Sequence, residues 1–455
     1  MAYSGYKLPI AQLSNSNRKK SITLYINNMK KFCLTGLLLS ITSFLLAQKT
    51  DAIFNAKEVH RIESVLASDA MKGRKVYSPE IDKAADFIGA EFKAAGLKSW
   101  NSGNSFRQEF VMISPKQISL TANFDNTEFD PQKIIVVTCQ PELTIDQSSG
   151  YETATIKAGG NLFQPAMEFA GSKKNIIVLV DTSYAKNFPR LSFLKRSLFK
   201  TDKNLVFVLG NELPKNFTIN AKHEIKEQKL ANVVGILPGK SRKDEYVIFS
   251  GHYDHIGIGK PVNGDSIYNG ANDDAAGITG VIMLAKYFAA LKNNERTLVF
   301  AAFTAEEVGG FGSQYFSQQF AADKVMAMFN IEMIGTESKW GKNSAYITGY
   351  DKTDMGSILQ KNLQGSGFTF HPDPYPDQQL FYRSDNATLA RLGVPAHTIS
   401  TAKMDDEPHY HKPSDHVETL DMENMAMIIK SIALSSTTIT AGKETPARVK
   451  KEDLR

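Results

Sequence analysis

In the C-terminal half of the chain, imidazole and acidic side chains follow the points where predicted strands end. These side chains are His252, Asp254, Asp273, Asp274, Glu306, Glu307, Glu332 and His411. Because ligands bind at the carboxyl ends of strands in an open α/β sheet, we expect all of them to lie at one edge. Taken singly, each has a structural explanation, such as a helix cap or a turn. Together they predict a crowded pocket in which buried charges need partners or a metal.

The chemistry of this set suits zinc, since imidazole and carboxylate are zinc ligands. Two metal ions about 3.5–4 Å apart need a bridging carboxylate, and Asp273 is our candidate for it. Asp254, two residues beyond His252, is placed to accept a hydrogen bond from the imidazole and to orient it. The adjacent Glu306 and Glu307 point in different directions, so that one can bind metal while the other takes a proton from water.

Four segments resemble the zinc aminopeptidase family that also contains glutamate carboxypeptidase and the transferrin receptor. They are Ser250–His255, Gly270–Asp274, Thr304–Glu307 and Asn330–Gly335. The separations from His252 to the later candidate ligands are also similar to the ligand spacing of that family. The resemblance covers residues 57–110 and 230–440, and the ordered set of motifs is far more specific than any single segment.

The resemblance implies a role for each residue of the set. One zinc ion would be held by His252, Asp273 and Glu332, and the other by Glu307, Asp273 and His411. Glu306 would act as general base and then as general acid, and Asp274 would support Asp273 in its turn. Glu332 stands where many members have Asp, one methylene shorter.

Two further segments resemble the family, but neither match is complete. Tyr382, Arg383, Ser384 and Asp385 resemble a substrate-side loop, but Asn386 follows where the family often has His. His409 competes with His411 for the last ligand position, and the family pattern resembles Tyr410–Asp415, which favours His411. We expect the remaining histidines of these segments to be loop residues near the rim: His255, His409 and His416.

The elements that must position these residues alternate between strand and helix from Asn232 onward. Strands are predicted at 246–250, 297–303, 326–334, 344–349 and 394–400, and helices at 275–291, 354–365 and 422–435. This alternation predicts an α/β fold, an α/β/α sandwich around a mostly parallel central sheet. The resemblance makes it the zinc-exopeptidase type, with a catalytic domain at residues 231–441.

Two segments before residue 231 complete the predicted organisation. Residues 48–110 have helical periodicity at 55–67 and 79–97 and are expected to be the N-terminal helices of the catalytic domain. Residues 111–230 carry β-rich runs at 134–137, 175–180 and 205–209. We interpret them as an inserted β-rich domain, similar to the protease-associated domain of the family, with an extension of the main sheet as the alternative. A charged tail at 442–455 is expected to fray.

Residues 1–47 are predicted to be a signal peptide region. A basic patch at Met29–Lys31 precedes the apolar run Phe32–Leu46, which is shorter than the ~20 residues of a membrane span. Met29 is an alternative start, which would place residues 1–28 upstream. The prediction is export to the periplasm or beyond the cell, without a stable membrane span after removal. Of the two cysteines, only Cys139 would remain, so no internal disulfide is expected.

The net charge and the motifs together limit the classes of function that this chain can have. The chain has a formal net charge of +5, but its first 47 residues contain basic side chains and no acid, which leaves the rest close to neutral. A neutral body has no basic stripe for nucleic acid. The resemblance implies an exported metallo-exopeptidase with two zinc ions and peptide substrates, an aminopeptidase in first place.

Three alternatives remain open at this point. They are a carboxypeptidase of the same family, a glutaminyl cyclase with one zinc ion, and a non-catalytic receptor on the same fold. The complete set of five ligands argues against the last two, because a cyclase needs fewer ligands and silent members have usually lost some. Side-chain specificity and oligomeric state cannot be predicted from the sequence.

Overall fold

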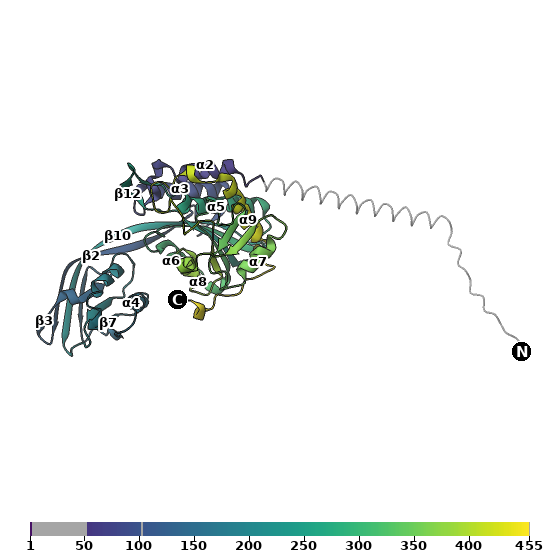
Figure 1. Cartoon of the computed structure of the whole chain (residues 1–455). Coiled ribbons are helices and arrows are strands. Elements are labelled where there is room, and N and C mark those ends of the chain that lie inside the picture. Colours follow the sequence, from purple (N-terminus) through teal and green to yellow (C-terminus); the bar gives the residue numbers. More distant parts are fainter. Residues whose placement is uncertain (2–51, 102, 455) are drawn as a thin grey trace.

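The computed structural model describes residues 1, 52–101 and 103–454, so the predicted signal region lies almost wholly outside the described residues. A large sheet runs through the molecule with its strands in the order β17-β16-β18-β15-β11-β14-β10-β2-β3 (Figure 1). The strands of this sheet are β1 (Lys98–Ser99), β2 (Arg107–Phe124), β3 (Thr127–Phe129), β5 (Glu142–Asp146), β8 (Leu198–Phe199), β10 (Phe217–Leu237), β11 (Arg242–His252), β14 (Arg296–Phe303), β15 (Val325–Ile331), β16 (Ser344–Ile347), β17 (Thr369–Pro372) and β18 (Ala396–Ser400).

Four parallel strands form the centre of this sheet. β11 pairs in parallel with β14 and with β15, and β15 pairs in parallel with β18. Every residue of β14 and β18 is buried, as expected for strands that are covered on both faces and carry continuous apolar runs. Antiparallel pairs of β10 with β14 and of β16 with β18 flank this centre. The predicted α/β fold is therefore confirmed, with a sheet that is mixed overall.

Helices cover both faces of the sheet (Figure 1). One face packs against α2 (Ala56–Leu66), α3 (Pro79–Ala94), α5 (Ala276–Leu291), α7 (Met355–Asn362) and α9 (Met422–Ser435), whose apolar residues share one core with β11 and β14. The other face packs against the short helices α6 (Phe311–Ser317) and α8 (Asn386–Ala390). The helix starts follow ordinary capping chemistry, since Asn55 Oδ1 accepts from Glu58 N at 2.9 Å and Pro79 opens α3.

α5 is the central helix of the larger core. Among the described residues, Ala271–Leu291 is the one helical stretch long and apolar enough to cross a membrane, and 83% of that window is buried inside the protein. A helix that is apolar all round and enclosed by other elements is a core helix. Its N-terminal end, the short turn η5 (Ala271–Ala275), carries two of the candidate site residues.

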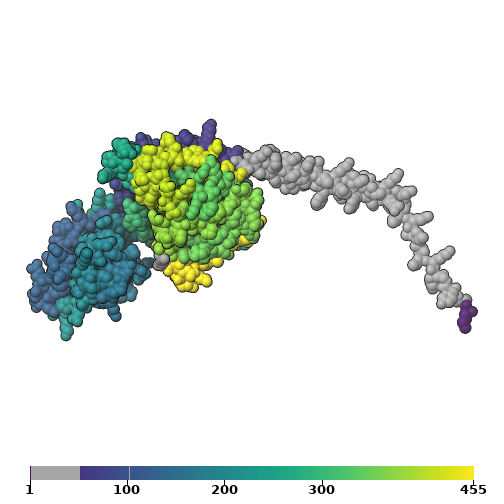
Figure 2. Space-filling model, viewed as in Figure 1, coloured from purple at the N-terminus to yellow at the C-terminus, as the bar shows by residue number. Residues whose placement is uncertain are grey.

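A second lobe stands beside the main body (Figure 2). It contains the sheet β4-β9-β7-β6 and the helix α4 (Phe163–Ala170). Its strands are β4 (Ile134–Val137), β6 (Glu152–Ile156), β7 (Ile176–Val180) and β9 (Leu205–Leu209), with β7 parallel to both β6 and β9. The long antiparallel pair β2 and β10 joins the lobe to the main sheet, so the boundaries expected at residues 110 and 230 lie inside continuous strands.

The C-terminal tail does not fray, and that expectation is wrong. The buried Arg296 donates from Nη1 to the carbonyl of Glu444 at 2.7 Å, and Arg448 donates to the carbonyl of Val325 at 2.7 Å. Val449 is buried and bonds to Gly393 through its backbone N–H. These contacts fix the tail against the first residues of β14 and β15 and against the segment before β18.

Candidate metal centre

The carboxyl ends of the central strands deliver the candidate side chains to one place. His252 is the last residue of β11, Glu306 and Glu307 follow β14, and Glu332 follows β15. Asp273 and Asp274 lie in η5 at the start of α5, and His411 lies in the loop between β18 and α9. The topology therefore brings together residues that are separated by up to 159 positions along the chain.

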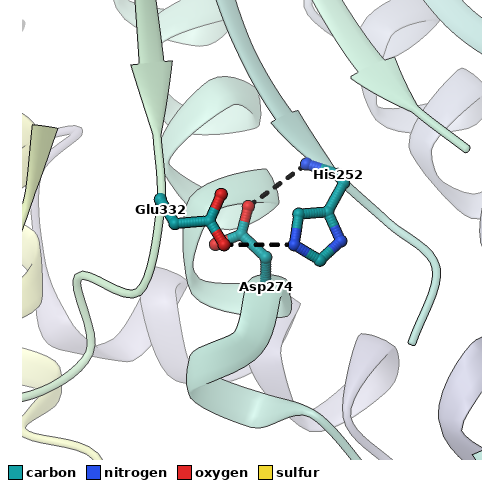
Figure 3. Close-up of side chains that lie close together, drawn as sticks. All are labelled: His252, Asp274 and Glu332. Carbon is teal, nitrogen blue, oxygen red and sulfur yellow. Dashed lines mark hydrogen bonds and ion pairs between the residues drawn. The ribbon is translucent and has the colours of Figure 1, made fainter. Parts of the chain in front are cut away.

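The first group of side chains forms around His252. Its Nε2 lies 3.2 Å from Asp273 Oδ1 and 3.2 Å from Glu332 Oε1. Figure 3 shows the imidazole of His252 facing the carboxylate of Glu332, with Asp274 beneath them. We call His252, Asp273 and Glu332 the His252 group.

The second group forms around His411. Its Nε2 lies 3.2 Å from Asp273 Oδ2 and 3.3 Å from Glu307 Oε2. We call His411, Asp273 and Glu307 the His411 group. The two oxygens of one carboxylate, Asp273, thus face two different imidazoles.

The spacing of these atoms fits metal ligands. Two ligands at the usual zinc distances of about 2.0–2.1 Å, in a tetrahedral arrangement, lie about 3.3 Å from each other. The four measured separations are 3.2, 3.2, 3.2 and 3.3 Å. In addition, the buried Glu307 Oε1 has no hydrogen-bond partner among the described residues, which is unusual for a buried carboxylate unless a cation satisfies it. The residues present therefore fit zinc.

The electrostatics of the His411 group come from opposite charges in close contact. Burial opposes ionisation of Glu307, but contacts with His255 and His411 outweigh it and lower its pKa to about 2. Burial lowers the pKa of His411, but the carboxylates of Asp273 and Glu307 raise it by more, and the pKa reaches about 10. For Asp273, hydrogen bonds to His252 and His411 outweigh burial and hold the pKa below its usual value. Protons on these imidazoles occupy the positions that a metal would take on binding.

Glu306 stands outside the short imidazole–carboxylate pairs of the two groups. It lines the same cavity as Asp273, Glu307 and Glu332. Burial raises the pKa of Glu306 well above its usual value, and the nearby carboxylates of Asp385, Glu332 and Glu307 add to this shift. A carboxyl group with a raised pKa is suited to accept and return a proton near neutral pH.

Asp254 acts through different atoms than expected. His252 Nδ1 lies 3.0 Å from the backbone carbonyl of Asp254, whereas the nearest carboxylate oxygen is 3.8 Å away. The carboxylate instead accepts from the backbone N–H groups of Glu306 at 3.0 Å and Glu307 at 3.4 Å. The predicted side-chain bond to the imidazole is therefore wrong. The residue orients His252 through its main chain and fixes the Glu306–Glu307 loop through its side chain.

Asp274 ties three elements together. Its Oδ1 accepts from the N–H groups of Gly277 and Met333 at 3.0 Å each, and its Oδ2 accepts from the N–H of His252 at 3.2 Å (Figure 3). Gly277 allows this close approach, because a Cβ there would lie 2.3 Å from Asp274 Oδ2 and 2.3 Å from the Ile331 carbonyl. The carboxylate of Asp274 thus holds the ends of β11 and β15 against the start of α5.

Two residues that sequence reasoning missed support the same loops. Asp415 accepts from the N–H groups of Asn272 at 2.8 Å and Asp273 at 3.1 Å. The only sequence signal for it was its place at the end of the segment that contains His411. Hydrogen bonds of this kind hold the backbone that carries the Asp273 carboxylate.

Arg74 is the second missed residue. It is completely buried and donates to the backbone carbonyls of Leu66, Tyr253, Asn269 and Gly270 at 2.6–2.8 Å. Tyr253 follows His252, and Gly270 precedes η5, so one guanidinium connects the N-terminal segment to both metal-side loops. No pattern in the sequence marks this arginine, because three of its four partners lie 179–196 residues away from it along the chain.

The backbone turns sharply at three positions beside the site. Ala305 (φ 60°), Met333 (φ 50°) and His411 (φ 55°) adopt the left-handed conformation, which costs roughly 1–2 kcal/mol for a residue with a Cβ. Ala305 precedes Glu306, and Met333 follows Glu332. Such strained positions gather at functional sites, where the surrounding structure holds them.

The predicted substrate loop divides into two parts. Ser384 Oγ donates to Glu332 Oε2 at 2.6 Å, and Arg383 lines the cavity beside it. Tyr382 and Asp385 do not line the cavity. Asp385 is buried behind it, where burial raises its pKa to about 7. The structure thus brings Ser384 and Arg383 to the site, and it keeps the other two residues of the loop away from the opening.

The three histidines expected at the rim have different positions. His409 Nδ1 lies 3.0 Å from Ser414 Oγ, and the half-exposed His416 lies 3.5 Å from Asp265, so neither joins the two groups. His255 is buried, with Nδ1 2.7 Å from Glu307 Oε1. The expectation that His255 is a rim residue is therefore wrong.

Four residues of the two groups, Asp273, Glu307, Glu332 and His411, line a cavity that also has apolar lining residues. The complete lining is Asp273, Glu306, Glu307, Glu332, Met333, Tyr346, Thr348, Leu380, Arg383, Ser384, Thr398, Ser400, Met404, Tyr410 and His411. Tyr346, Leu380 and Met404 belong to a small apolar cluster of their own. A cavity with an apolar wall opposite a few charged groups is typical of a small-substrate site.

Comparisons with known proteins agree with this geometry. Residues 232–435 match Peptidase family M28. A "Probable leucine aminopeptidase" of Trichophyton verrucosum (strain HKI 0517) is 29% identical over 204 residues, which cover 43% of this chain and 53% of that protein. A "Probable zinc metalloprotease" of Pyricularia oryzae is 35% identical over 112 residues, covering 24% of this chain and 22% of that protein. The chain spans about half the length of the leucine aminopeptidases that it matches.

Solved structures show the same fold. The aminopeptidase from Aneurinibacillus sp. strain AM-1 superposes with a TM-score of 0.51 at 19% identity, over 88% of this chain and 96% of that one. A zinc aminopeptidase from Bacillus subtilis superposes with a TM-score of 0.50 at 18% identity, over 86% of this chain and 97% of that one. At these identities the likeness concerns the fold.

Proposed function

Since the domain formed by residues 232–435 belongs to peptidase family M28, a family of the zinc aminopeptidase type, we propose that this protein removes amino-terminal residues from peptides by means of two zinc ions. The observation that carries the proposal is the position of Asp273. Its two carboxylate oxygens lie 3.2 Å from the imidazoles of His252 and His411, which is the arrangement of a carboxylate shared by two ions.

The residues of the site divide the chemistry between them. Bound zinc would polarise the scissile carbonyl and make an attacking water more acidic. Glu306, on the cavity wall, takes a proton from the water and returns it to the leaving amine. The Asp254 carboxylate keeps Glu306 in place by accepting a hydrogen bond from the backbone N–H of Glu306. Both proton transfers need the carboxylate of Glu306 beside the metal ligands but not bound among them.

The cavity also supports a preference for an apolar amino-terminal residue. The free α-amine is a cation, and the acidic wall formed by Glu306, Glu307 and Glu332 would bind it. The apolar wall, with Leu380 and Met404, would take the side chain. The relatives named probable leucine aminopeptidases are consistent with such a substrate.

The experiment that tests the proposed function compares substrates with and without a free amine. Leucine arylamide, glutamate arylamide and N-acetyl-leucine arylamide are offered to the zinc-loaded protein, with and without a chelator. We expect turnover of the leucine compound, at least tenfold slower turnover of the glutamate compound, and none of the blocked compound. Equal turnover of blocked and free substrates would contradict an aminopeptidase. An N-terminal glutamine peptide in the same panel detects cyclisation in place of hydrolysis.

One observation favours a second candidate, a carboxypeptidase. Arg383 lines the cavity, and a guanidinium is well suited to a carboxylate. If this arginine binds the C-terminal carboxylate of a peptide, an N-blocked dipeptide with a free carboxylate is cleaved, and Arg383→Gln raises its KM. No cleavage of that dipeptide would rule this candidate out.

We also propose that the protein is exported, on the strength of the basic patch and apolar run within residues 1–47. Expression with and without residues 1–47, followed by fractionation, tests this. Retention of the full chain inside the cell would contradict it.

A further inference from the structure

His255 is a buried imidazole beside the His411 group that the proposed mechanism does not use. Its exposed fraction is 1%, and it follows the loop that carries His252 and Asp254. The ring of His255 lies edge-on to that of His411, with 5.8 Å between the centroids. The side chain is therefore enclosed within the site, and its polar atoms must be accounted for there.

Neither ring nitrogen of His255 has a hydrogen-bond partner among the described residues, and neither does Glu307 Oε1. Yet His255 Nδ1 lies 2.7 Å from that same oxygen. Two polar atoms this close without hydrogen-bond geometry do not point at each other. A cation at a position shared by both atoms would satisfy the buried imidazole and the buried carboxylate together.

The neighbouring ligand atoms place that position in the His411 group. His255 Nδ1 lies 3.9 Å from Asp273 Oδ2, the oxygen that also faces His411. One ligand atom from each of His255, Asp273 and Glu307 lies within 4.8 Å of the others. That spread is compatible with ligands of one ion.

The ring of His255 is also held in place from two sides. A Cβ on Gly270 would lie 2.5 Å from its Cγ, so the backbone of Gly270 packs directly on the imidazole. The backbone N–H of His255 donates to the Arg74 carbonyl at 3.3 Å, which fixes the main chain that carries the ring. A fixed ring with a free nitrogen in the site is preorganised for a ligand.

We propose that His255 is an additional metal ligand, which completes the zinc site of the His411 group beyond the five ligands implied by the family resemblance. The inference rests on the proposed function, since it requires that zinc binds there. The His411 group then offers four protein side chains, His255, Asp273, Glu307 and His411, whereas the His252 group offers three. An ion with fewer protein ligands keeps more coordination positions, so the His252 group would leave more of them for water and substrate.

The test measures zinc binding directly. The metal-free protein is titrated with zinc as wild type, as His255→Ala and as the control His416→Ala, which removes a half-exposed histidine outside both groups. We expect two tight ions for wild type and for the control. For His255→Ala we expect one tight ion and a second one weakened by more than ~100-fold, beyond the range of 10–100-fold for residues that only orient a ligand.

A second readout separates a ligand from a hydrogen-bond donor. In a crystal structure of the zinc-loaded protein, anomalous scattering locates the zinc ions. We expect one of them at about 2.0–2.1 Å from His255 Nδ1. A separation above about 3 Å would overturn the inference. So would an unchanged second affinity in a folded His255→Ala or His255→Gln variant. A wild-type protein that binds fewer than two ions would contradict the proposed function itself, and that outcome is visible before any variant is compared.

Discussion

Glu63 offers a prediction whose size follows from the structure. It lies on α2, is completely buried, and accepts a hydrogen bond from Thr279 Oγ1 of α5 at 2.6 Å. Burial raises its pKa from the ordinary 4.5 to about 8, although the nearby Arg74 acts in the opposite direction. Glu63 is therefore protonated in the folded protein at pH 7, but it is ionised in the unfolded chain.

The free energy of unfolding should fall with rising pH for this reason. Between pH 4.5 and pH 8 the folded state binds a proton that the unfolded state has lost, so stability decreases through that window and levels off above it. At 1.36 kcal/mol per pH unit, the loss is about 3 kcal/mol at pH 7 and about 5 kcal/mol above pH 8. Glu63→Gln removes the titration and keeps the oxygen that accepts from Thr279.

The assay is chemical denaturation of wild type and Glu63→Gln at pH 5, 7 and 8.5. We expect the variant to be more stable, by an amount that grows with pH to the values above. The control is Glu58→Gln on the same helix, because the hydrogen bond from Arg61 lowers the pKa of Glu58 to about 2. That variant should be less stable by nearly the same amount at pH 5, 7 and 8.5, because this contribution is lost only as the pH falls from about 4.5 to about 2. A Glu63→Gln variant that is destabilised at pH 8.5 would refute the reasoning, since it would mean that Glu63 is ionised against Arg74.

Three further predictions concern the site and its supports. Glu306→Gln should lower kcat by about 10²–10⁴ with zinc content unchanged, and near-normal turnover would end its assignment as general base. Arg74→Met should lower the free energy of unfolding by about 3–5 kcal/mol, because four buried carbonyls lose a charged donor. Arg61→Met on the surface should lower it by less than about 1 kcal/mol. Equal effects of the two substitutions in chemical denaturation would contradict this prediction. Gly277→Ala should lower the free energy of unfolding by about 1–3 kcal/mol and should reduce zinc affinity, because the new Cβ displaces Asp274. The control is Gly89→Ala, where the nearest atom to the new Cβ is 3.7 Å away, and it should lower neither quantity. Zinc titration and chemical denaturation of both variants test this prediction.

The main elements and the grouping of the candidate ligands at one sheet edge could be predicted because each depends on local order. The apolar run of β14 ends directly before Glu306, and the periodicity of α5 begins directly after Asp274, so position in the chain indicates position at the sheet edge. The predicted α/β fold follows from the same alternation. Motifs of this kind keep their meaning without knowledge of the rest of the fold.

Features that depend on distant contacts could not be predicted. Arg74 binds carbonyls at Tyr253 and Gly270, almost 200 residues away, and nothing in its own segment indicates this. His255 was expected at the rim because its neighbours form a loop, but the close packing of Gly270 encloses it. The side chain of Asp254 binds the loop after β14, since the backbone carbonyl already accepts from the imidazole. In each case the tertiary contact selects the atom, which a pattern of residue types does not specify.

The most direct test of the central claim is the number of zinc ions that one folded chain holds. Native mass spectrometry of the zinc-loaded protein, after removal of loosely bound metal, counts them. The shared position of Asp273 between His252 and His411 predicts two ions per chain in wild type and fewer in Asp273→Asn. A wild-type protein with one ion or none, or an Asp273→Asn variant that still holds two, would contradict the account.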